Sequence, residues 1–165
     1  MTRIAPVFAK SFEHETWQAR VVMKAAWDVD LKFTPKEGMK PLGDLANHLA
    51  QIPSLDFSFY KMEIKSIEQA QQVEKDLRRE SISEMLEVYD EGVERVINFF
   101  EELSDDEFLD AKIKPCYQEG DPKPWSHYFP DMIRHVAMHK MQLWMYLKLS
   151  GETVDMMTYY GVPSE

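Results

Sequence analysis

Two histidines lie four residues apart in the stretch RHVAMHKMQLWMYLKLS, which runs from Arg134 to Ser150. In an α-helix, residues i and i+4 lie one above the other on the same face. The imidazole nitrogens of His135 and His139 can therefore converge on one cation, at about 2.0–2.1 Å each for zinc. A pair of core histidines bonded to tyrosine, glutamate or the backbone would show the same spacing. The spacing alone leaves both interpretations open.

The polar residues of this stretch gather on one side of the predicted helix. Its polar sector is about 80° wide and contains Asp131, His135, His139, Gln142 and Tyr146. Most other positions are apolar, and a helix that is apolar nearly all round is buried on more than one side. Because buried polar groups are costly unless they are partnered, this row predicts a site inside the fold or at its mouth.

A third metal ligand is expected from another element, because two ligands from one helix hold a metal weakly. His48 is the best candidate, since it flanks an apolar stripe and can face inward. His14 lies between two glutamates and is expected to be exposed, whereas His127 could line the mouth of the site. Three protein ligands with an open position form the catalytic pattern, and a fourth protein ligand gives the structural one.

A metal with an open position could serve two kinds of reaction. It lowers the pKa of a bound water toward about 7, as a hydrolase needs, and it deprotonates a bound thiol, as a thiol transferase needs. Gln142 and Tyr146, one and two turns beyond His139, and Glu15 are candidates for holding substrate or ligands. Ordinary polarity at a rim is the competing interpretation for all three. Cys116 is either a reactive thiol or an ordinary loop residue.

Four helical segments can position these residues. They are predicted at residues 4–27, from Pro41 onward with a kink or break at Pro53, after Ser81 with a heptad stripe to Leu103, and from Ser126 or Pro130 to Ser150. Residues 65–79 and 104–127 are predicted connections. No run of residues alternates as a half-buried strand would. The pattern predicts an all-α four-helix bundle in a single domain spanning residues 1–165.

Another side of the last helix carries Ala137, Met141, Trp144 and Lys148. If nothing covers this side, exposed tryptophan and methionine would indicate a dimer interface. If other helices cover it, the same residues are core packing. The periodicity leaves both interpretations open.

Composition narrows the classes of function. The formal charge is −10, which disfavours binding to nucleic-acid phosphates. One cysteine allows no internal disulfide, and the N-terminal residues lack the apolar region of a signal peptide. No stretch approaches the roughly 20 apolar residues that span a bilayer. We therefore expect a cytoplasmic protein that acts on a small molecule and binds neither nucleic acid nor membrane.

Three segments together resemble the DinB/YfiT superfamily. They are LGDLANHLAQI, which contains His48, FFEELSDDEFLD, which closes the third helix, and HVAMHKMQLWMYLKLSG, which contains His135, His139 and Gln142. The resemblance covers essentially the whole chain in the order and spacing of its elements. The chain departs from the family at Lys140 and Met141, where members often have arginine and glycine, so any role tied to those two residues is in doubt.

The resemblance implies a DinB-like four-helix bundle with long crossover connections. It implies one divalent metal held by His48, His135 and His139, with nickel or zinc favoured over iron or manganese. It also implies a homodimer. Characterised members include transferases and isomerases that use low-molecular-weight thiols such as bacillithiol or mycothiol, and many others have no known activity.

Two hypotheses for function follow. The first is a metal-dependent enzyme of the thiol-dependent S-transferase or hydrolase type, which uses a three-histidine site. The alternative is a non-enzymatic stress-response or binding protein whose metal site is structural or vestigial. The same three ligands serve both hypotheses.

Overall fold

The computed structural model describes residues 3–162, and their regular structure is helical. The helices within this range are α1 (Ile4–Lys24), α2 (Leu42–Tyr60), α3 (Ile67–Leu77), α4 (Ile82–Glu102), α5 (Asp105–Asp110), α6 (Trp125–Ser150) and α7 (Met156–Tyr159). The only strand-like pairing among the described residues is an isolated antiparallel bridge between Ile113 and Lys123. The predicted all-α class is confirmed.

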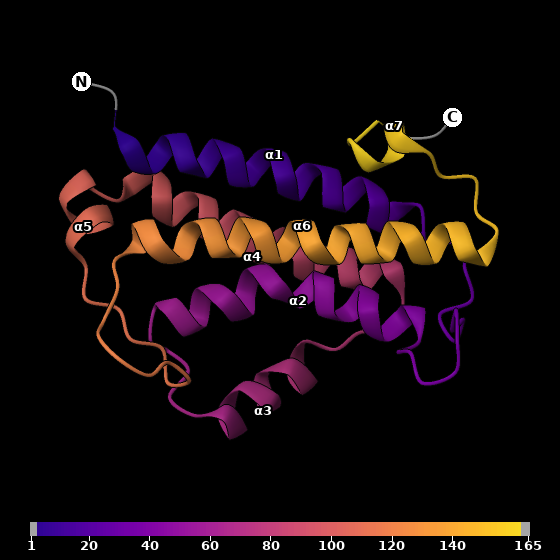
Figure 1. Cartoon of the computed structure of the whole chain (residues 1–165), viewed down its shortest axis with the longest axis horizontal. Coiled ribbons are helices and arrows are strands. Elements are labelled where there is room, and N and C mark those ends of the chain that lie inside the picture. Colours follow the sequence, from indigo (N-terminus) through magenta and orange to yellow (C-terminus); the bar gives the residue numbers. More distant parts are fainter. Residues whose placement is uncertain (1–2, 163–165) are drawn as a thin grey trace.

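Four long helices, α1, α2, α4 and α6, form a bundle (Figure 1). Both α1 and α2 pack against α4 and against α6, so α1 lies diagonally across the bundle from α2. Figure 1 shows α1 and α6 running in one direction, and α2 and α4 in the other. The connection at 61–81 therefore runs back along the length of the bundle to join the parallel helices α2 and α4, and it is the expected long crossover. The connections at 25–41 and 103–124 join diagonal helices at one end of the bundle. Helices α2 and α6 become antiparallel neighbours.

Helix α4 has the predicted heptad stripe. Its stripe residues are buried from Ile82 to Leu103, except for the partly buried Val93. The Ser81 side chain accepts a hydrogen bond from the Glu84 backbone N–H and so caps the start of the helix. Near the end of the stripe, Phe100 stacks on Phe129 of α6 with ring centroids 3.8 Å apart. This aromatic contact fixes one end of α6 against the core.

Helix α2 continues through Pro53, so of the kink or break expected there the break is wrong. The adjoining Gly92 of α4 has a packing role. A Cβ atom at Gly92 would lie 2.6 Å from Ser54 Oγ and 3.0 Å from the Ser54 backbone nitrogen. The glycine therefore permits close approach of α2 and α4, which offsets its cost inside a helix.

The predicted connections contain two short helices. Helix α3 lies in the polar stretch at 65–79 and packs on α2 through a small cluster that includes Ala70. Its apolar residues recur at helical spacing in the sequence, at Ile67, Ala70, Val73 and Leu77, so the prediction of a plain connection missed this signal. Helix α5 begins at a capping box formed by Ser104 and Glu107.

Helix α7 covers part of α6 near the C-terminal end of the described chain. The indole Nε1–H of Trp144 donates a hydrogen bond to the Asp155 carbonyl oxygen at 2.8 Å, and the Trp144 ring contacts Tyr159. Trp144 is buried. Of the two interpretations of that side of α6, core packing applies at Trp144. Within residues 3–162, no helix is long and apolar enough to cross a membrane.

Replacing Gly92 with alanine should destabilise the protein. The added methyl group would overlap Ser54, and overpacking costs about 1–3 kcal/mol, which exceeds the helix-propensity gain of about 1 kcal/mol. Urea denaturation should show a lower free energy of unfolding for Gly92→Ala. Glu94→Ala, at an exposed position of the same helix, is the control and should change stability little. A Gly92→Ala protein at least as stable as wild type would contradict the close-packing explanation.

Candidate metal centre

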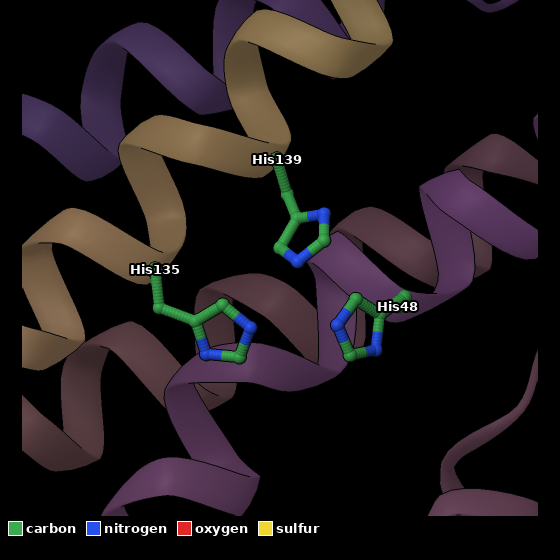
Figure 2. Close-up of side chains that lie close together, drawn as sticks. All are labelled: His48, His135 and His139. Atoms are coloured by element: carbon green, nitrogen blue, oxygen red, sulfur yellow. The ribbon is translucent and has the colours of Figure 1, made fainter.

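Two neighbouring helices bring three histidines together. His48 comes from α2, and His135 and His139 come from successive turns of α6. One ring nitrogen from each lies within 4.8 Å of the other two, and all three side chains are partly buried. Figure 2 shows the rings pointing toward one another from the two helices. The packing of α2 on α6 thus creates a cluster that could hold a metal ion.

Hydrogen bonds orient two of the three imidazole rings. His135 Nδ1 lies 2.9 Å from Asp56 Oδ2, and His139 Nδ1 lies 2.7 Å from Gln142 Oε1. Both oxygens are acceptors, so Nδ1 of each ring donates the hydrogen. Each Nε2 then keeps a free electron pair for a metal. Carboxylate and amide partners of this kind typically fix the tautomer of metal-binding histidines and raise their basicity as ligands.

Burial favours the neutral forms of His48 and His139. Burial of the His48 ring, together with the neighbouring His139, His135 and Lys40, lowers the pKa of His48 from 6.5 to about 4. Burial also lowers the pKa of His139, although the hydrogen bond to Gln142 opposes this shift. Neutral imidazole is the form that binds metals. Protons therefore compete weakly with a metal for His48 and His139 at pH 7.

The donor set fits particular metals. Three imidazole nitrogens suit zinc, nickel, copper or iron, whereas magnesium and calcium prefer oxygen ligands. The ligand group found among residues 3–162 has three members rather than four. Three protein ligands leave a coordination position for water or substrate. The chemistry of the donors thus agrees with a transition-metal site but does not select one metal.

A cavity of about 620 Å³ opens beside His48 and His139. Two residues singled out from the sequence, Gln142 and Tyr146, line it. Gln142 holds His139, as described above. The Tyr146 hydroxyl donates a hydrogen bond to the Lys40 carbonyl oxygen at 3.2 Å, so its polar atom supports the segment that precedes α2.

Glu15 is not part of this cluster, contrary to its place among the sequence candidates. Its Oε1 atom lies 2.7 Å from Lys140 Nζ, on the side of α6 that packs against α1. Oε1 makes no aligned hydrogen bond, so the contact is mainly electrostatic. Lys140 Nζ also donates a hydrogen bond to Gln18 Oε1 at 2.5 Å and lies 4.1 Å from the Tyr159 ring centroid. Lys140 thus joins α1, α6 and α7.

The remaining candidates lie outside the cluster. His14 is exposed, as expected, and its Nε2 lies 2.9 Å from Gln18 Nε2. His127 and Cys116 are also exposed. Sequence reasoning missed Asp56, which holds His135. Its signal was its position eight residues after His48 on α2, a spacing that keeps two side chains on one side of a helix.

In a comparison with models of protein families, the model described as DinB superfamily matches residues 13–143. The chain belongs to the DinB superfamily. A crystal structure of a DinB-like protein from Bacillus cereus ATCC 10987 has a similar fold, with a TM-score of 0.71. The two chains are 18% identical, and the match covers 90% of this chain and 93% of the other. No curated protein matches this DinB chain.

The stability of the metal-free DinB bundle should depend on His48 between pH 6.5 and about 4. In this range the unfolded chain binds a proton at His48 that the folded protein does not, so the free energy of unfolding falls as the pH falls. The depressed pKa of His139 acts in the same direction. Urea denaturation at several pH values should show that the free energy of unfolding falls less steeply with falling pH for His48→Gln than for wild type. Equal slopes would contradict this explanation.

Replacing Lys140 with methionine should destabilise this DinB protein by about 3 kcal/mol, because it leaves the largely buried Glu15 carboxylate without its positive partner. The double variant Glu15→Gln/Lys140→Met removes both charges and should recover most of that loss. Urea denaturation of the wild type, the two single variants and the double variant measures the coupling. Additive single effects would rule out a stabilising ion pair.

Proposed function

We propose that His48, His135 and His139 bind one divalent metal ion, with nickel or zinc favoured over iron or manganese. The DinB protein would then be a metal-dependent enzyme, either a thiol-dependent S-transferase or a hydrolase. The observation that carries this proposal is the cluster of three histidines beside a cavity. Hydrogen bonds at Nδ1 orient two of its rings, those of His135 and His139. A site of this kind admits a small molecule to the metal.

The chain's own residues have distinct roles in this proposal. Asp56 and Gln142 hold His135 and His139 so that Nε2 of each ring faces the ion. Lys40 lines the adjoining cavity and provides positive charge near the histidines. Such a charge favours an anion near the open position. When bound, the metal makes a coordinated water or thiol more acidic, which supplies the nucleophile for either reaction type.

Metal titration tests the ligand assignment. Chelator-treated protein should bind one zinc or nickel ion in calorimetry, and His48→Ala, His135→Ala and His139→Ala should each weaken binding by about 100-fold or more. Asp56→Asn should weaken it by about 10-fold, because it disturbs the partner of a ligand rather than a ligand. His14→Ala and His127→Ala are matched controls and should bind like wild type. Unchanged affinity in His135→Ala would refute the assignment.

Spectroscopy and assays of metal-loaded protein separate the two functional hypotheses. In cobalt-substituted protein, a low-molecular-weight thiol should produce a sulfur-to-cobalt charge-transfer band if the site serves a transferase. Ester and amide substrates without thiol test the hydrolase. If the protein binds metal but accepts no thiol and turns over neither substrate class, the non-enzymatic alternative gains support.

The expected partners follow the same proposal. A small-molecule substrate, such as a low-molecular-weight thiol and its co-substrate, is consistent with a cavity of about 620 Å³. The homodimer expected from the family resemblance stays a prediction, and light scattering at several protein concentrations would measure it.

A further inference from the structure

The cavity beside the histidines has an apolar wall that the proposed metal chemistry does not explain. Met141, Met145 and Leu149 of α6 line the cavity. They follow His139 in the chain and are spaced four residues apart, so they lie on one side of the helix. Their exposed fractions are 41%, 43% and 59%. Met39, which precedes α2, and Leu45 of α2 also line the cavity. A groove with apolar walls therefore extends from the histidine cluster toward the end of α6.

The composition of this groove suits a flexible apolar ligand. Cavities of about 300–1,000 Å³ are usual for small-molecule sites, and they are lined mainly by apolar side chains with a few polar groups. Methionine side chains are unbranched and polarisable, so they adapt to ligands of varied shape. Met39, Met141 and Met145 therefore provide a surface that could adjust around an alkyl chain or an aromatic ring.

Lys40 provides a polar group where the groove meets the histidines. It lines this groove together with His48 and His139, and its positive charge contributes to the lowered pKa of both rings. Among residues 3–162, no carboxylate lies within ion-pair distance of its ammonium group. The hydrogen bond from Tyr146 to the Lys40 backbone holds this segment against α6. An anionic ligand group at this point would meet an uncompensated positive charge.

We infer that the groove binds the apolar chain of an amphiphilic substrate whose anionic or metal-binding head group lies between Lys40 and the three histidines. The substrate class is a compound with an acyl, alkyl or aryl tail. This inference rests on the proposed metal function for the position of the head group. The continuity of the groove with His48 and His139, together with the positive charge at their junction, favours a small amphiphile over a second copy of the chain.

A series of n-alkyl hydroxamates tests the inference, because the hydroxamate head binds the metal while the chain length varies. Calorimetry with zinc-loaded protein should show affinity rising about twofold or more per added methylene, against about fourfold for complete burial. Lys40→Gln should weaken every member by about threefold and leave the chain-length dependence intact. Affinity that is independent of chain length would overturn the inference.

A pair of matched variants locates the chain on α6. Met145→Gln/Leu149→Gln replaces two groove side chains and should reduce the affinity gain per methylene, while binding of zinc and acetohydroxamate stays unchanged. Met138→Gln is the control, because Met138 is 52% exposed on the same helix and does not line the groove. Equal chain-length dependence in the double variant and the control would place the chain elsewhere and overturn the inference.

A third measurement separates failure of the groove from failure of the metal proposal. Metal-free protein should bind decanoate more tightly than hexanoate, below the concentrations at which either forms micelles, and Lys40→Gln should weaken both. This result would support the groove even if zinc did not bind. If the protein binds zinc and acetohydroxamate but shows no chain-length dependence in either series, the groove inference fails and the metal proposal stands. If ligand affinity does not depend on chain length and Met145→Gln/Leu149→Gln abolishes a dimer that wild type forms, the groove is a contact surface for a second copy of the chain, and the inference is overturned.

Discussion

The antiparallel packing of α2 on α6 is the contact on which the candidate site depends. It places His48 opposite two successive turns of α6, where the ring centroids of His48 and His139 lie 4.5 Å apart. Burial there lowers the pKa of His48 and of His139, so both rings favour the neutral form that binds a metal. Asp56 and Gln142 then determine which nitrogen of His135 and His139 remains free. The packing of two helices thus also determines the protonation and orientation of the ligands.

Helix α6 carries different polar chemistry on two of its sides. His139 faces α2 and the cavity, whereas the next residue, Lys140, is buried against Glu15 of α1. The ion pair and the contact with Tyr159 tie α6 to α1 and α7, while the histidines tie it to α2. Helix α6 is therefore positioned from both sides of the bundle. Met141, the second departure from the usual family motif, lines the apolar groove.

The sequence predicted the fold class and the pairing of His135 with His139 because each depends on local spacing, whereas the approach of His48 depends on how α2 packs on α6. His135 and His139 share a face in any helix, and the apolar stripe beside His48 indicated an inward direction. The partner of Glu15 was not predictable in this way, since it depends on the rotation of α1 relative to α6. Asp56 was missed because one aspartate on an amphipathic helix usually faces solvent. The covering of Trp144 was left open because a helix as short as α7 has too few residues for a periodic pattern.

The most direct test of the account is a crystal structure of zinc- or nickel-loaded protein with anomalous data collected at the edge of that metal. The account predicts one anomalous peak bonded to nitrogens of His48, His135 and His139, with at least one further position taken by solvent. It also predicts that Nδ1 of His135 remains bonded to Asp56. A peak elsewhere, or a site closed by a fourth protein ligand, would contradict the central claim.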